Sequence, residues 1–418
     1  MPYVRRMEED GPMDSGDTAW MLAATALVMI MLPGLALFYG GLVRRKNVLS
    51  TIMHSFFGLA IVSVVWVLVG FSLAFGPDAN GMGLIGNLDF VGFFNVGLLP
   101  STVYATTIPF VLFAAFQLMF AAITPALITG AFAERKRFAS FVLFTVLWSV
   151  LVYSPIAHWV WATDGWLFKL GALDFAGGTV VHASSGLSAL IVALLIGRRV
   201  VNGEPLEPHD IPMTVLGAGL LWFGWFGFNA GSAVAANGLA ASAFIVTNTA
   251  AGAATLTWVG ASYMHRKKVS VVGAACGAVA GLVAITPASG FVTPGGAIIV
   301  GLVAGGLCYS ATLLRERIKV DDALDVFAVH GIGGIFGAIA TGVLATSAIQ
   351  PNFKGLIDGN AGQVMTQLLA VAATVAYAVA ATFVIVKLVD LVLGIRISPK
   401  EEEVGLDLAV HGEVAYQT

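Results

Sequence analysis

The chain has 418 residues, of which 58% are hydrophobic and only 11% are charged. The mean hydropathy is +0.89. A chain with so few polar residues cannot cover a water-soluble surface, which excludes a water-soluble globular protein. Long unbroken apolar runs, such as 56–75 and 368–386, exclude an outer-membrane barrel, whose strands alternate apolar and polar residues. The net charge of −3 gives no indication of nucleic-acid binding. The sequence predicts an all-α integral membrane protein without a sizeable soluble domain.

Eleven apolar runs of spanning length follow one another along the chain. They cover residues 18–43, 51–75, 104–132, 138–158, 175–197, 211–232, 238–264, 269–287, 294–314, 325–347 and 363–394. Lys and Arg clusters at 44–46, 135–137, 198–199, 266–268, 315–319 and 387–400 fall on every second side and leave only Arg5, Arg6, Lys169 and Lys354 for the other. Because basic residues favour the cytoplasmic side, the alternation predicts an outside N-terminus and a cytoplasmic C-terminus.

The predicted spans divide the chain into three regions. Residues 1–17 are expected to form an extracellular N-terminal segment that is not cleaved, and residues 18–397 to form the transmembrane domain. Residues 398–418 are polar and are expected to form a cytoplasmic tail. Composition leaves open whether the tail is solvated or docks as a regulatory segment.

Two histidines are predicted to lie deep in the membrane. His182 is in the fifth span, about 24 Å along the helix from Arg198, and His330 is in the tenth, about 16 Å from Lys319. Spans 1–5 and 6–10 would form inverted repeats, because an odd number of spans reverses direction, with a long eleventh helix beside them. Equivalent histidines would then converge near the midplane, where transport sites are built. Each histidine alone also fits a buried structural role.

An aspartate stands a few residues before each histidine. Asp174 and Asp325 can each cap the start of a helix by accepting bonds from free backbone amides. Capping is the favoured interpretation of Asp325. For Asp174, capping and a functional role of the carboxylate charge are equally supported by the sequence.

Aromatic residues and a hydroxyl share faces of two spans. Trp225, Phe228 and Ser232 are spaced i, i+3, i+7 on the sixth span, while Phe116 and Phe120 share a face of the third. Measured along the helices, Phe120 and Phe228 lie at a similar depth and are predicted to meet. Such a stripe is usual in core packing, but rings beside a hydroxyl also suit a small cation.

The motifs around these residues resemble the ammonium transporters of the Amt/Mep/Rh family, and the prokaryotic Amt branch in particular. They are PGLALFYGGLVRRKN at 33–47, FQLMF at 116–120, GAFAER at 130–135, DFAGGTVVH at 174–182, GWFGFNAGS at 224–232 and DVFAVHGIGG at 325–334. Two departures stand out. The WATDG loop at 161–165 replaces a glycine run, which leaves the shape of the pore mouth open, and Ala328 replaces a glycine often seen before the second histidine.

The resemblance implies a role for each residue singled out above. An outer site for ammonium would comprise Trp161, Phe120 and Ser232, with Asp174 shaping it and assisting deprotonation. Phe120 and Phe228 would form a gate, and His182, His330 and Trp225 would line the pore. The resemblance also implies a homotrimer with one pore per subunit, control by a cytoplasmic PII-type signalling protein at the tail, and no cofactor or metal.

The expected function is transport of ammonium, with methylammonium as a usable tracer, across the cell membrane. A dry pore disfavours the charged ion and passes NH3, so a cation that cannot lose a proton is rejected. Whether a proton follows separately stays open. The alternatives are a membrane ammonium sensor and an electroneutral gas channel of the Rh kind. An enzyme is disfavoured, because the sequence has no metal-ligand cluster, nucleophile motif or phosphate-binding loop.

Overall fold

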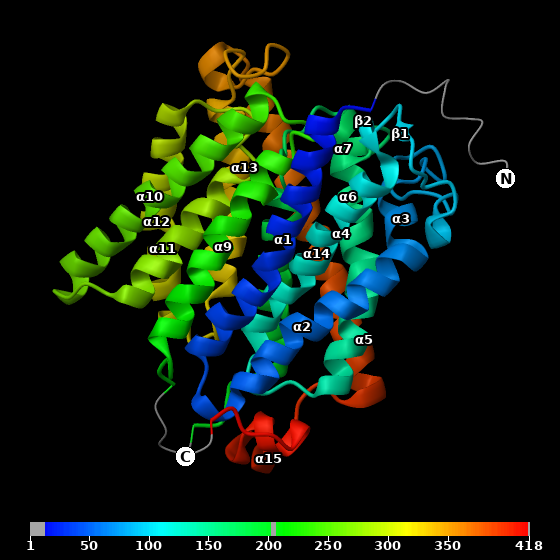
Figure 1. The fold of residues 1–418 in the computed structure, drawn as a ribbon. Helices are drawn as coiled ribbons and strands as arrows, with labels where there is room; N and C mark the ends of the chain where they lie inside the picture. The colour runs from blue at the N-terminus through cyan, green and yellow to red at the C-terminus, as the bar shows by residue number, and fades with distance from the viewer. Residues whose placement is uncertain (1–12, 202–205, 417–418) are drawn as a thin grey trace.

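The computed structural model describes residues 13–201 and 206–416 as a bundle of long helices (Figure 1). The helices are α1 (Ser15–Leu42), α2 (Val48–Val65), α3 (Phe71–Phe75), α4 (Phe110–Ile128), α5 (Phe138–Trp148), α6 (Ser154–Trp161), α7 (Trp166–Lys169), α8 (Ser184–Ile196), α9 (Ile211–Gly231), α10 (Gly238–Arg266), α11 (Val271–Ile285), α12 (Pro294–Ile318), α13 (Ile332–Leu344), α14 (Gly362–Leu393) and α15 (Pro399–Val404). Short π-helical segments join α2 to α3 and α5 to α6, and others lead directly into α8 and α13.

Within the described residues, ten helices are long and apolar enough to cross a membrane. They correspond to ten of the eleven predicted spans. The run predicted at 269–287 is the exception, because α11 has only 15 residues, fewer than the ~20 that a spanning helix takes.

Two predicted boundaries differ from the structure. The run predicted from residue 104 begins as a strand, β2 (Ala105–Pro109), which pairs antiparallel with β1 (Pro100–Ser101). Hydropathy does not separate a short apolar strand from the start of a helix. At the N-terminus, α1 already begins at Ser15, where the Asp14 side chain accepts a bond from the Asp17 amide. The rest of the predicted N-terminal segment, residues 1–12, lies outside the described residues.

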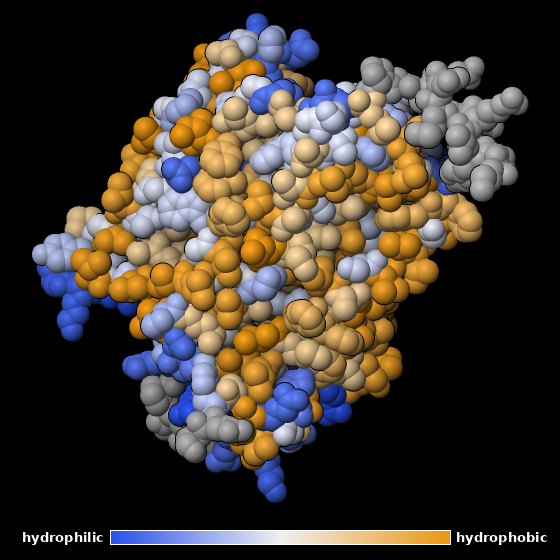
Figure 2. Space-filling model, in the orientation of Figure 1, coloured by the Kyte–Doolittle hydropathy of each residue, from blue (hydrophilic) through white to orange (hydrophobic). Residues whose placement is uncertain are grey.

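The surface of the bundle is apolar along its middle. Figure 2 shows hydrophobic residues across the centre of this face and hydrophilic residues toward both ends. Large apolar side chains such as Leu256 and Leu391 are 73% and 83% exposed, which water would penalise and lipid tails do not. We call the end with β1, β2 and α7 the strand end, and the end with α15 the tail end (Figure 1).

The tail is docked onto the tail end. The amide of Arg137 donates to the carbonyl of Ile395, and the amide of Ile397 donates to the carbonyl of Arg135, at 3.0 and 3.2 Å. Further on, the carboxylate of Asp407 accepts bonds from two amides at the start of α2, those of Leu49 and Ser50. The tail is therefore docked against the bundle rather than fully solvated.

Two carboxylates of the tail, those of Glu401 and Glu402, bind residues close to them in the sequence. Glu401 completes a capping box with Ser398 at the start of α15. Glu402 binds Arg396, which lies just before the tail, at 2.8 Å. Glu402 also accepts a bond from the amide of Val200, so it ties the tail to the loop that follows α8.

Glycines let two pairs of helices meet at backbone distance. A Cβ placed on Gly186 of α8 would lie 2.1 Å from the amide nitrogen of Gly331, at the turn before α13. One on Gly217 of α9 would lie 2.2 Å from the amide nitrogen of Phe38 in α1. Small residues at such contacts are what allow close helix packing in lipid.

We predict that Gly186→Ala destabilises the protein, because the new methyl group meets backbone atoms that cannot rotate away; overpacking of this kind costs about 1–3 kcal/mol. The measurement is the thermal unfolding temperature in detergent. Gly219→Ala on α9 is the matched control, since nothing lies within 4 Å of a Cβ there and alanine favours a helix over glycine. Equal unfolding temperatures for the two variants would contradict the prediction.

Candidate functional site

Two histidines meet in the centre of the bundle. His182 lies in the π-helical segment Gly178–Ala183, and His330 lies in the π-helical segment Phe327–Gly331. Their Nδ1 atoms are 3.2 Å apart and both rings are buried. A hydrogen bond at this distance holds one proton, so one Nδ1 donates while the other accepts. The predicted convergence of the two histidines is therefore confirmed.

Local backbone structure positions the pair. Each histidine sits in a π-helical segment, a feature found frequently at functional sites, and each segment runs directly into a helix of 13 residues, α8 or α13. Gly334 of α13 permits the approach, since a Cβ there would lie 2.7 Å from the amide nitrogen of Ala183 and 2.8 Å from the Cβ of His182. A side chain at this position would separate the rings.

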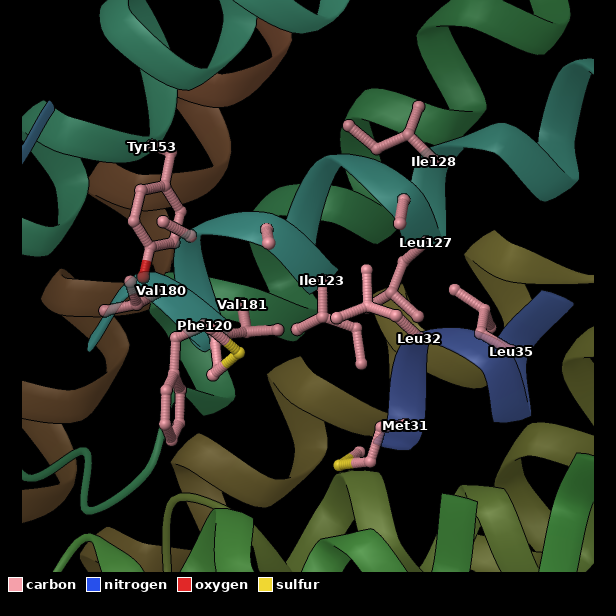
Figure 3. Close-up of a cluster of buried hydrophobic side chains, with 14 of the residues drawn as sticks. Met31, Leu32, Leu35, Phe120, Ile123, Leu127, Ile128, Tyr153, Val180 and Val181 are labelled. Atoms are coloured by element: carbon pink, nitrogen blue, oxygen red, sulfur yellow. The ribbon is translucent and has the colours of Figure 1, made fainter. Parts of the chain in front are cut away.

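A narrow apolar cavity surrounds the histidine pair. Its volume is about 10 Å³, close to the minimum that holds one water-sized molecule. The apolar lining comes from α1, α4, α9, α11 and the segment before α8, and comprises Met31, Leu35, Phe38, Ile123, Leu127, Val181, Leu221 and Val279. Figure 3 shows five of these side chains, Met31, Leu35, Ile123, Leu127 and Val181, within one buried cluster. The cavity offers a small neutral molecule space and offers an ion little solvation.

Two phenylalanines close the cavity toward the strand end. The rings of Phe120 and Phe228 lie 4.2 Å apart between centroids, as their predicted depth requires. Phe228 and Trp225 both stack near His182, at 6.0 and 5.4 Å. The indole of Trp225 donates to the hydroxyl of Thr286, which fixes the ring beside the pair.

A vestibule of about 240 Å³ lies beyond the two phenylalanines at the strand end. Phe120, Trp161 and Ser232 line it together, and the ring of Trp161 stands perpendicular to that of Phe120 at 5.8 Å. The Ser232 hydroxyl donates to the carbonyl of Phe228, which leaves its oxygen lone pairs to accept a bond from a cation. Ring faces and one acceptor oxygen suit a small cation.

Tyr104 and Gln117 are among the residues of the vestibule wall that the sequence analysis does not predict. Gln117 stands inside the FQLMF motif, one turn before Phe120, so helical spacing was the available signal. Tyr104 precedes β2, in a stretch predicted to be helical, and no spacing rule connects it to the site.

Asp174 lies behind the vestibule and caps the turn that carries His182. Its carboxylate accepts bonds from the amides of Gly177, Gly178 and Thr179, at 2.6–2.7 Å, and from the Thr179 hydroxyl. Its backbone carbonyl accepts the indole N–H of Trp161. The capping interpretation is thus correct for Asp174, and the carboxylate remains close to the outer site.

The expected capping role of Asp325 is wrong. The amide of Phe327 donates instead to Asp322, at 2.7 Å, whereas Asp325 has a left-handed backbone (φ 57°) and binds Arg315 of α12 at 2.6 Å. Burial, opposed by the charge of Arg315, raises the pKa of Asp325 to about 6. Asp325 and Arg315 line a second cavity, of about 460 Å³, at the tail end.

Comparisons with known proteins agree along the whole described chain. Residues 19–416 match the model of the Ammonium Transporter Family. The chain is 52% identical to the ammonium transporter of Bacillus subtilis, over 97% of this chain and 99% of that one. It is 50% identical to ammonium transporter Amt1 of Archaeoglobus fulgidus, over 97% and 100%.

The chain belongs to the ammonium transporter family. Its fold matches the crystal structure of Mep2 from Saccharomyces cerevisiae with a TM-score of 0.86 at 39% identity, covering 93% of this chain and 91% of that one. The resemblance found in the motifs is thereby confirmed, as is the expectation of a multi-pass membrane transporter rather than an enzyme.

We predict that Asp174→Asn strongly lowers methylammonium uptake by the transporter. Asparagine caps nearly as well as aspartate, so the fold is kept while the charge is lost; charge-assisted bonds contribute about 1.5–3 kcal/mol, which corresponds to a loss of about tenfold or more. Asp210→Asn is the matched control, because Asp210 caps α9 through the Met213 amide far from the vestibule. Near-normal uptake by both variants would assign Asp174 to capping alone.

Proposed function

We propose that the transporter binds NH4+ in the vestibule, deprotonates it, and conducts NH3 past the histidine pair. The observation that carries the proposal is a continuous order of environments: ring faces and a hydroxyl at Trp161 and Ser232, the stacked rings of Phe120 and Phe228, then a dry cavity around His182 and His330. The first environment favours a cation, and the last favours a neutral molecule.

The energetics of the cavity support this division. A charge in the hydrocarbon core costs about 2.5–3.5 kcal/mol or more, and an apolar lining returns almost none of it. Low polarity therefore favours release of the proton before NH3 enters. Potassium is similar in size but has no proton to lose, so it is rejected at the same step. Imidazoles hydrogen-bonded to each other can both guide NH3 and relay a proton.

The proposal also covers the orientation of the chain in the membrane and its internal repeat. We infer that α11 completes eleven spans, that the strand end is extracellular, and that spans 1–5 and 6–10 are inverted repeats. Equivalent elements support the repeat, because both histidine segments are π-helical and continue as helices of equal length. The basic clusters support the orientation, since Arg135, Arg198 and Arg396 meet around the tail end.

Two partners belong to the proposal on the strength of the family resemblance. One is a second and third copy of the chain, giving a homotrimer with one pore per subunit. The other is a PII-type signalling protein at the docked tail.

Sensing is the second candidate function. One similar structure, with a TM-score of 0.86 at 31% identity and covering 94% of this chain, is described as "Sensor Amt Protein". Transport and sensing are not exclusive, and the paired histidines of this chain favour conduction. An electroneutral gas channel of the Rh kind differs from the main proposal only in carrying no net charge.

Currents recorded from proteoliposomes after an ammonium pulse test the proposal. We expect an ammonium-driven current, and we expect His182→Ala and His330→Ala each to abolish it or change its selectivity, because each removes half of the only hydrogen bond between the rings. Both variants should keep the oligomeric state of the wild type. Full current and full ammonium-over-potassium selectivity in both would show that the histidines only pack.

Deleting the residues after Ile397 tests the role of the tail. We expect lower uptake with an intact oligomer, and loss of any response to a PII-type protein, because the deletion removes the Asp407 contacts at the start of α2. The comparison is uptake and thermal stability of the full and shortened chains with and without that protein. Undiminished uptake and an unchanged response would rule out a regulatory role.

A further inference from the structure

A buried histidine lies between two aspartates at the strand end, outside the path described above. His158 of α6 is fully buried, and its Nε2 lies 3.6 Å from Oδ1 of Asp78 and 3.7 Å from Oδ1 of Asp164. The Asp78 side chain is 7% exposed and that of Asp164 is 30% exposed. Two distant segments, the loop at Asp78 and the stretch 158–164, thus bring one imidazole and two carboxylates together at the edge of the bundle.

The hydrogen bond on the other side of the ring fixes its protonation. Nδ1 of His158 lies 3.1 Å from the carbonyl oxygen of Ala74. A carbonyl only accepts, so Nδ1 must carry a proton. In a neutral ring, Nε2 would then turn a bare lone pair toward both carboxylates. A second proton on Nε2 replaces that repulsion with attraction to two anions, which opposes the cost of burying the charged ring.

The remaining contacts of the cluster leave these atoms available. Among residues 13–201 and 206–416, neither Nε2 of His158 nor Oδ1 of Asp164 has a hydrogen-bond partner. Oδ2 of Asp164 accepts the amide of Asp78 at 2.5 Å, which ties the two loops together. Burial opposes ionisation of Asp78, but backbone amides of Gly83 and Gly81 outweigh it and lower the pKa of this carboxyl. Asp78 is therefore an anion.

The cluster is joined to the vestibule through α6. His158 precedes Trp161 by three residues, and Asp164 follows it by three, so the two sides of the cluster flank the vestibule tryptophan. The chain turns back sharply between them, since a Cβ on Gly165 would lie 2.0 Å from the carbonyl oxygen of His158. Loosening either end of this turn moves the segment that carries the Trp161 ring.

The charge of Asp164 also acts on Tyr104, a residue of the vestibule wall. Burial, followed by the charge of Asp164, raises the pKa of Tyr104 well above its ordinary value, and Tyr104 lines the vestibule with Thr163. A change at the cluster therefore reaches the site from two sides.

We propose that Asp164 is a positioning residue for cation recruitment: with Asp78 it holds a doubly protonated His158, and this ion cluster fixes Trp161. The inference rests on the proposed function, in which Trp161 receives the cation. The proton on Nε2 is held at low external pH and leaves as the pH rises. Recruitment is then weaker at high external pH, because two carboxylates face an unprotonated nitrogen and the loops separate.

Other titratable groups packed against α6 do not face His158. The segment α3 contains none, and Lys169 of α7 is exposed. The ring of Tyr153, just before α6, lies against Trp66. His182, in the segment before α8, faces Trp225 and His330 instead. Asp78 and Asp164 are the charges that His158 meets.

The test is the half-saturating concentration of methylammonium for uptake by proteoliposomes, measured from mildly acidic to mildly alkaline external pH. Methylammonium is a suitable probe because an alkylammonium such as the lysine side chain has a pKa of about 10.4, so the probe stays charged throughout. We expect the wild-type value to rise about fivefold over this range, which corresponds to about 1 kcal/mol. Asp164→Asn should show a raised value that no longer depends on pH, with an unchanged maximal rate, and Asp164→Glu should restore the pH dependence.

Asp89→Asn is the matched control. Asp89 is exposed in the same loop region as Asp78 and binds the side chain of Asn87, so its loss removes one carboxylate without touching the cluster. It should keep the wild-type profile. If Asp164→Asn does not fold, His158→Gln supplies the same comparison.

Two results would overturn the inference. One is a wild-type pH profile in Asp164→Asn or His158→Gln. The other is a lower maximal rate in these variants at every pH with no change in half-saturation, which is the signature of a structural role only. Absence of saturable uptake by the wild-type protein would instead contradict the proposed function, so the two failures are distinguishable.

Discussion

The close approach of two interrupted helices in the centre of the bundle is the constraint on which the rest of the structure depends. Two imidazoles are placed in apolar surroundings, where an unpaired polar group is costly, and their mutual bond at 3.2 Å satisfies one nitrogen of each ring. That bond requires backbone contact between α8 and the turn before α13, so Gly186 and Gly334 cannot carry larger side chains without moving the rings. The π-helical segments supply the local displacement that brings each ring toward the other.

A cavity of this kind cannot also attract its substrate, so attraction has to occur elsewhere. The vestibule provides it through the open faces of Trp161 and Phe120 and through the Ser232 oxygen, all of them outside the stacked phenylalanines. Neither part would discriminate alone, since aromatic faces bind many cations and an apolar pore passes many small neutral molecules. In the proposed function, their order along one path makes loss of a proton the condition for passage. Asp174 then lies where a carboxylate can influence that step while it caps the turn that holds His182.

Hydropathy predicts most of the fold, because lipid leaves a chain few alternatives to apolar helices. Helical spacing and depth also predicted that Phe120 meets Phe228 and that His182 meets His330. The failures concern contacts between distant segments. Capping is expected for Asp325 because the sequence shows neither its partner, Arg315, which belongs to another helix, nor its left-handed backbone. The apolar composition of strand β2 does not distinguish it from the start of a helix. The approach of Asp78 to His158 depends on a loop path that no periodicity encodes.

The two ends of the bundle are held by different chemistry, and this difference sets where pH can act. At the tail end, Glu134 bridges Arg44 and Arg199, and Arg199 also binds Asp321 at 2.8 Å. Burial would raise the pKa of Asp321, but Arg199 and Arg135 outweigh it and lower the value to about 2. A carboxylate with a lowered pKa contributes stability above its unfolded-state pKa, near 4, and loses it only as the pH falls toward 2, so these ion pairs persist at neutral pH. Guanidinium groups hold the tail end permanently, whereas an imidazole joins the loops at the strand end. If the His158 cluster fixes Trp161 as proposed, the strand end is the part of the fold that responds to pH, because its junction contains an imidazole.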